Sequence, residues 1–291
     1  MNKLFENWRG FLKEQDTQIS GNLQLYYKLY PKAKNEKLRE YYSSDSRIVK
    51  LNAQTALEQV IQGYLDNFQS FKRLIKSLPG YEKQSDENIK NIYDNSVSEI
   101  AKNLKAAPVK VFLDDIDRFT PQDLKVPQAL YNTENKTIYV NPFNIKEKGK
   151  AFLKKMRFAL KEEYIHLAQD ILSKIKMPTH QLIWQKAKKA GLILPREQTG
   201  MGEVYDYFAK NPWEFHAKLW QLKLILKKHM SQAFDETGKI DPNALKQLIS
   251  DPRGAELEIL KILDPAKINQ IKILFDMVAK TDVKRPTRSI A

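Results

Sequence analysis

The sequence of 291 residues contains no cysteine and only ten glycines. The missing cysteine excludes disulfide bonds, thiolate metal sites and cysteine nucleophiles, and it suits a reducing compartment. No segment approaches the roughly 20 apolar residues that cross a bilayer, and the N-terminal segment carries charges throughout, unlike a signal peptide. We therefore expect a mainly helical protein that is made in the cytoplasm and stays or assembles there.

Two families of sequence motif are also missing. There is no glycine-rich phosphate loop and no Gly-x-Ser-x-Gly turn, so the sequence supports neither nucleotide chemistry nor serine hydrolysis. Hydrophobic residues make up 42% of the chain, which is a composition that folds.

Acidic residues are outnumbered, with 35 Asp and Glu against 49 Lys and Arg and a formal charge of +14. Such an excess attracts polyanions such as nucleic acid, an anionic membrane surface or an acidic protein. No helix-turn-helix, zinc-finger or RNA-binding signature accompanies the charge. We therefore assign most lysines to the polar faces of helices and expect only non-specific nucleic-acid binding.

The chain divides into three regions by sequence texture. We expect helices over 1–105, a core with the best strand candidates over 106–235, and a helical C-terminal region with a basic tail over 236–291. The strand candidates are 109–113 and 136–140, and long helices are expected over 150–176 and 211–234. The fold class is therefore mainly α (α+β), with a small β-sheet.

A short amphipathic helix is expected at the N-terminus. Its apolar stripe consists of Leu4, Trp8, Phe11 and Leu12. The stripe either packs against the body of the protein or docks on a partner.

The helix expected over 150–176 carries the residues with chemical potential. Glu162 and His166 are four residues apart and therefore share one face, a spacing by which one helix grips one metal ion. Glu163 and Asp170 fall within the apolar arc, which is costly unless they are paired, protonated or bound to a metal. Glu163 stands beside the pair, where a general base for a metal-bound water belongs.

These residues carry a family resemblance. The segment 160–170 resembles the zincin metallopeptidase motif His-Glu-x-x-His, with its first histidine replaced by Glu162. The segment 205–217 resembles the Tyr-x-x-x-Pro-x-Glu-x-x-Ala block of peptidases encoded by tailed bacteriophages, and the opening residues 4–13 look like the start of many marine phage reading frames. The resemblance covers roughly residues 108–235.

The resemblance implies a zincin-like core and a role for each residue. Glu163 would be the general base, and His166 and Glu214 would be metal ligands beside Glu162 in the first-ligand position. The expected cofactor is Zn²⁺, although an oxygen-rich set of this kind also suits another divalent metal, or none if the site is degenerate. A strand near 138–141 would hold an extended peptide substrate by edge pairing.

Each assignment has a structural alternative. Glu162 would be a solvated residue that pairs with a lysine or with His166, Glu163 would pair with a basic side chain, and His166 would be a hydrogen-bonded core histidine. Glu214 would close a capping box with Asn211 at the start of the next helix. His216 is interpreted as a weak substitute ligand. His180 and His229 are interpreted as surface residues.

Two functions follow from these readings. The first is a metal-dependent hydrolase that acts on a peptide or protein. The second is a non-catalytic structural or interaction protein of a phage virion, whose partners are other virion proteins. The expected location is the host cytoplasm or the virion. A basic protein packaged with a genome is a third reading that rests on charge alone.

Overall fold

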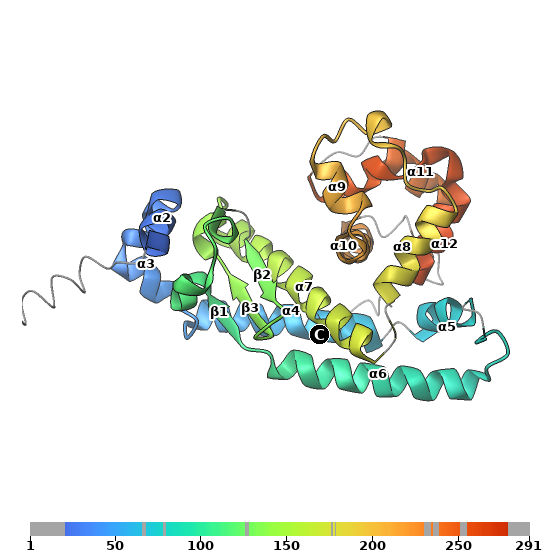
Figure 1. Cartoon of the computed structure of the whole chain (residues 1–291), viewed down its shortest axis with the longest axis horizontal. Helices are drawn as coiled ribbons and strands as arrows, with labels where there is room; N and C mark the ends of the chain where they lie inside the picture. Colours follow the sequence, from blue (N-terminus) through green and yellow to red (C-terminus); the bar gives the residue numbers. More distant parts are fainter. Residues whose placement is uncertain are drawn as a thin grey trace, which may run out of the picture. The chain divides into compact units, whose positions relative to one another are not determined.

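The computed structural model describes residues 21–65, 68–77, 80–125, 128–175, 177, 179–229, 234, 239–250 and 255–278. It is mostly helical with one small mixed sheet (Figure 1), so the expected fold class is confirmed. The N-terminal stripe and the basic tail lie outside the described residues. No described helix is both long and apolar enough to cross a membrane.

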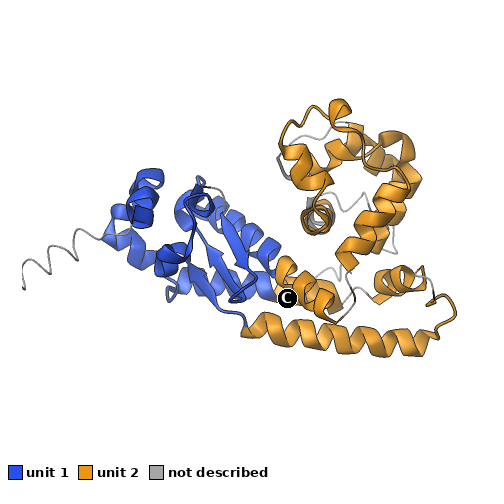
Figure 2. Cartoon of the chain, in the orientation of Figure 1, with its two compact units in different colours: residues 1–57, 107–164 blue, residues 58–106, 165–291 orange. Residues whose placement is uncertain are grey.

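The chain forms two compact units that are each discontinuous in sequence. Unit 1 comprises residues 1–57 and 107–164, and unit 2 comprises residues 58–106 and 165–291 (Figure 2). This division cuts across the three regions that the sequence texture suggested, and those regions stay a prediction. Two helices pass from one unit to the other: α4 (Arg47–Leu65) and α7 (Gly149–Lys174).

The sheet of unit 1 has three short strands in the order β1-β3-β2: β1 (Val109–Val111), β3 (Thr137–Val140) and β2 (Ala129–Asn132). β1 runs parallel to β3, and β2 runs antiparallel to it. The turn between β2 and β3 is fixed by the Asn132 side chain, whose oxygen accepts hydrogen bonds from two backbone amides. β2 was missed because its four residues carry little strand signal.

The position of β3 corrects one expectation. β3 pairs with a strand on each side, from Val109↔Ile138 on one and from Asn132↔Thr137 on the other. The prediction that residues 138–141 form a substrate-binding edge strand is therefore wrong, because their backbone groups are already used within the sheet. Among the described residues, the antiparallel edge of this sheet belongs to β2.

Unit 1 has a core cluster that is rich in aromatic side chains. Helix α2 (Gly21–Leu29) packs against residues 112–124, and α3 (Glu36–Tyr41) follows it. Tyr26 is fully buried and donates a hydrogen bond of 2.6 Å to Oδ1 of Asn141, just after β3. This hydrogen bond connects α2 to the segment that follows β3.

The described part of unit 2 consists mainly of helices, with two isolated β-bridges, Ile193↔Leu263 and Phe234↔Ile240. Its helices are α5 (Phe68–Lys76), α6 (Asp86–Ala106), α8 (Thr179–Lys189), α9 (Val204–Ala209), α10 (Pro212–His229), α11 (Pro242–Ser250) and α12 (Ile268–Met277). α10 contacts α8, α9 and α12. Its residues Phe215, Leu219 and Trp220 are buried, as expected for a helix surrounded by others.

Two close contacts fix α10 in unit 2. A Cβ at Gly63 would come within 2.5 Å of the Trp220 ring, so the end of α4 can approach α10 only at a glycine. Lys223 is 2% exposed, and its Nζ donates to the backbone oxygens of Phe275 and Val278 at 2.8 and 2.7 Å. A buried lysine thus caps the C-terminal end of α12.

Candidate metal centre

Helix α7 positions the first two candidate ligands. Glu162 and His166 lie one turn apart on this uninterrupted helix, and they are 8% exposed each. The boundary between the two units falls between Tyr164 and Ile165. The relative position of Glu162 and His166 is nevertheless fixed, because both lie on the same continuous helix. The alternative of a solvated Glu162 is wrong.

Helix α10 positions the third candidate. Asn211 precedes the helix and its Oδ1 accepts a hydrogen bond of 3.0 Å from the Trp213 amide, so the predicted N-cap is present. Glu214 follows in the first turn, and its Oε1 lies 3.5 Å from Nε2 of His166. The side chain that the resemblance assigned as third ligand, with a capping box as the alternative, therefore lies beside the histidine of α7.

The three candidate ligands converge. One ligand atom from each of Glu162, His166 and Glu214 lies within 4.8 Å of the other two. Two ligand atoms about 2.1 Å from a tetrahedral ion lie about 3.4 Å apart, which is close to the observed His166–Glu214 separation. A hydrogen bond would be shorter. The donor set of two carboxylates and one imidazole fits a divalent ion; that they bind one stays a prediction.

Glu163 has a partner that the sequence did not indicate. Its Oε2 accepts a hydrogen bond of 2.6 Å from the backbone N–H of Tyr131 in β2. Because the Asn141 amide donates to the Gln128 oxygen and pair types alternate along an antiparallel ladder, Tyr131 and Ile138 form a non-hydrogen-bonded pair. The Tyr131 N–H therefore points away from β3. Glu163 therefore occupies a donor on the outer edge of β2, and a peptide cannot pair with that donor unless the carboxylate moves.

A buried glutamine lies between His166 and His216. Gln169 is fully buried, and its side chain lies 2.9 Å from Nδ1 of His166 and 2.9 Å from Nδ1 of His216. The sequence analysis missed Gln169. Its spacing of three residues from His166 was the available signal, because residues three apart share a helical face.

The remaining histidines of unit 2 correct the sequence analysis. His180, expected at the surface, is fully buried beside Trp213 with its ring centroid 5.0 Å away. Burial and then the nearby His166 lower the pKa of His180 to about 4, and burial lowers that of His216 to about 3. Both are held neutral because an imidazolium loses hydration in the interior. The side chain of His229 lies outside the described residues.

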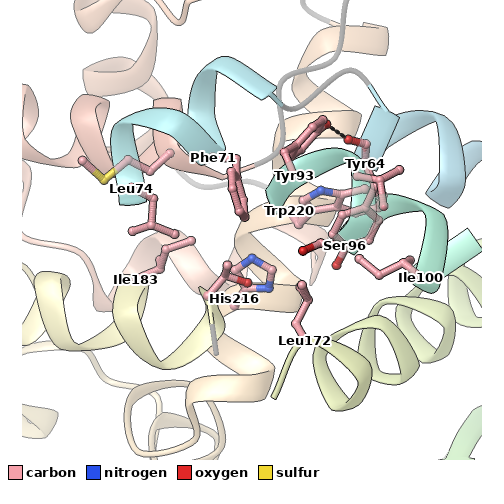
Figure 3. A pocket seen from close by; sticks show the side chains of 13 residues that line it. Tyr64, Phe71, Leu74, Tyr93, Ser96, Ile100, Leu172, Ile183, His216 and Trp220 are labelled. Atoms are coloured by element: carbon pink, nitrogen blue, oxygen red, sulfur yellow. Dashed lines mark hydrogen bonds between the residues drawn. The ribbon is translucent and has the colours of Figure 1, made fainter. Parts of the chain in front are cut away.

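A small cavity in unit 2 lies beside His216 (Figure 3). It has a volume of about 30 Å³ and is lined mainly by apolar and aromatic side chains, among them Phe71, Leu172 and Trp220. This volume holds a water molecule or two and no substrate. The cavity is therefore not a catalytic cleft.

Known proteins add no identification. No protein-family model, no curated protein and no solved structure matches this chain. The function must be argued from the site itself.

Proposed function

We propose that this chain is a divalent-metal-dependent hydrolase that acts on peptides or proteins, with a zincin-like arrangement on α7. The observation that carries the proposal is the convergence of Glu162, His166 and Glu214 within 4.8 Å. Two of these residues are acids that are largely buried, and such groups need a compensating charge or a proton. A divalent cation is one such compensating charge.

The roles of the residues follow from their positions. Glu162, His166 and Glu214 would hold the ion. The expected ion is Zn²⁺, and a harder divalent metal is also suited because two of the ligands are oxygen. The ion would polarise a substrate carbonyl and acidify a water molecule. Glu163 would take the proton from the attacking water and pass it to the leaving amine. The Tyr131 amide holds one oxygen of that carboxylate in place.

One observation favours a second function. Glu163 already bonds the outer edge of β2, which is a structural task and blocks one backbone donor that a bound peptide would use. On this alternative the chain is a non-catalytic interaction protein, such as a virion component, which keeps a zincin-like scaffold and its metal site.

Two measurements on the full chain separate these readings. Elemental analysis of purified protein should find about one divalent ion per chain in the wild type and none in His166→Ala. Hydrolysis of an unfolded protein substrate should then disappear in Glu163→Gln, which keeps the metal and can still accept the Tyr131 hydrogen bond.

The outcomes are distinct. Metal without hydrolysis in the wild type supports the non-catalytic alternative. No metal in the wild type, even after incubation with Zn²⁺, refutes both the hydrolase and the metal-bearing scaffold. Glu162→His, which restores the full zincin motif, is the companion variant, and Glu162→Gln is its control.

A further inference from the structure

In unit 2, hydrogen bonds join the buried side chains of His166, Gln169 and His216, with the proposed metal ligand His166 at one end. His166 Nδ1 lies 2.9 Å from Gln169 Oε1, and Gln169 Nε2 lies 2.9 Å from His216 Nδ1. The same Nε2 donates to the backbone oxygen of Trp213 at 3.1 Å. Gln169 is 0% exposed and His216 5%, so these contacts are shielded from bulk solvent.

The Trp213 carbonyl determines which way the amide of Gln169 points. A backbone carbonyl oxygen can only accept hydrogen bonds. If the amide were turned over, its own oxygen would face the Trp213 oxygen, and two acceptors would meet in a buried place. The nitrogen of Gln169 therefore faces Trp213 and His216, and its oxygen faces His166.

This orientation determines the tautomer of His166. Because the Gln169 oxygen has no hydrogen to give, Nδ1 of His166 must donate the proton between them. In the neutral ring the lone pair is then on Nε2. Nε2 is the atom that lies 3.5 Å from Oε1 of Glu214.

We propose that Gln169 is a positioning residue, which holds His166 in the Nδ1–H tautomer and so presents the Nε2 lone pair to a divalent cation between α7 and α10. The inference rests on the proposed metal site. A neutral histidine side chain in water carries its proton mainly on Nε2, so without Gln169 the ligand nitrogen would mostly carry a hydrogen. Partners of this kind behind a metal-binding histidine fix the tautomer and ring orientation.

The tautomer is tested first in the metal-free full chain. Long-range ¹H–¹⁵N correlation at pH 8, where an ordinary imidazole is neutral, should show His166 protonated at Nδ1 and unprotonated at Nε2. The chain has four histidines, so His166→Asn suffices for the assignment. A wild-type His166 that carries its proton on Nε2 overturns the inference.

Metal affinity is tested next, by titration with Zn²⁺ against a chromophoric chelator. Gln169→Met keeps the shape of the side chain and removes the acceptor, so it should bind Zn²⁺ about 10- to 100-fold more weakly than the wild type. Gln221→Met is the matched control, because Gln221 is also a buried amide of unit 2, 2% exposed; it should stay within about threefold. Equal affinities in Gln169→Met and wild type overturn the inference.

A rescue variant guards against a trivial folding defect. Gln169→Glu restores an acceptor for Nδ1–H, and its second oxygen replaces the amide nitrogen beside the Trp213 oxygen, where it must carry a proton to donate as the nitrogen does. In that protonated form the variant should bind Zn²⁺ more tightly than Gln169→Met. If Gln169→Met does not fold, the wild-type spectrum still decides the matter: a proton on Nε2 of His166 counts against the inference. A wild type that shows the tautomer and takes up no Zn²⁺ refutes the metal site and supports the positioning of His166.

Discussion

Several polar side chains of unit 1 and those around His166 in unit 2 differ in their partners. In unit 1, Glu163 accepts from the Tyr131 amide, Tyr30 donates to the Leu124 oxygen and the half-buried Asn22 donates to the Phe119 oxygen, so all three bind the backbone. In unit 2, around His166, side chains bind one another. Polar groups that bind backbone hold an irregular chain in place, whereas a network of side chains sets the direction and proton of one particular atom.

The comparison applies even to two successive residues of α7. Glu163 anchors a strand of its own unit, while Glu162 lies within 4.8 Å of His166 and Glu214. Substitutions in unit 1 other than at Glu162 should therefore change stability, and substitutions at Glu162 and around His166 should change metal binding. Four predictions test this division, from the largest expected effect to the smallest.

The largest effect is expected from His166→Ala. Zn²⁺ at a thousand times its Kd should raise the free energy of unfolding of the wild type by about 4 kcal/mol, because the ion binds only the folded site. In His166→Ala this increment should vanish, and Glu163→Gln should keep it. Urea unfolding with and without Zn²⁺ measures both, and an undiminished increment in His166→Ala would break the comparison.

Acid should destabilise unit 2 specifically. The folded-state pKa values of His180 and His216, about 4 and about 3, lie below the ordinary histidine value. Below about pH 6.5 the unfolded chain binds protons that the folded chain does not, so stability falls as pH falls, by up to about 1.4 kcal/mol per pH unit for each histidine.

Urea unfolding of metal-free protein between pH 6.5 and 5 measures this slope. His180→Leu should lose the contribution of one histidine and be less sensitive to acid. All four histidines lie in the sequence of unit 2, so a signal from unit 1 should not show the slope. An unchanged slope in His180→Leu contradicts the assignment.

Glu163 should matter for stability. Glu163→Leu leaves the Tyr131 N–H without its charged acceptor and should cost about 2 kcal/mol, whereas Glu163→Gln keeps an acceptor and should cost about 1 kcal/mol or less. Chemical denaturation of the metal-free variants gives both values. Glu214→Gln is the comparison in unit 2; if it costs more than Glu163→Leu in the absence of metal, the division of roles fails.

Tyr26→Phe should show the smallest effect. The change removes the hydroxyl that donates to Oδ1 of buried Asn141, and it should cost about 1 kcal/mol with no change in Zn²⁺ affinity. Tyr41→Phe serves as a control, because Tyr41 is 54% exposed, and it should be neutral. A loss of Zn²⁺ binding in Tyr26→Phe would contradict the separation of the two networks.

Local sequence signals were sufficient for much of the fold. The helix expected over 150–176 is observed as Gly149–Lys174, and the strand expected over 136–140 as Thr137–Val140. Both have strong local periodicity or β-branched residues. The helices expected over 1–105 include two that follow closely, Arg47–Leu65 and Phe68–Lys76, and periodicity alone does not show where one helix stops and the next begins.

The other features of the fold depend on contacts between segments far apart in sequence, and the sequence analysis did not predict them. The sequence suggested a strand at 138–141 as the open edge, but strand order depends on which distant segment pairs with which side, and β2 took that place. His180 looked like a surface residue because its neighbours in sequence are polar, yet α8 buries it against Trp213 from α10.

The sequence by itself determined that this is a mainly helical chain with Glu162 and His166 on one face of a long helix, because a period of 3.6 residues is a local property. Only the tertiary structure decided that Glu214 lies 3.5 Å from His166, that Glu163 accepts from the Tyr131 amide of β2 and that Gln169 contacts His216. These three facts depend on packing between segments far apart in sequence, which no local pattern encodes.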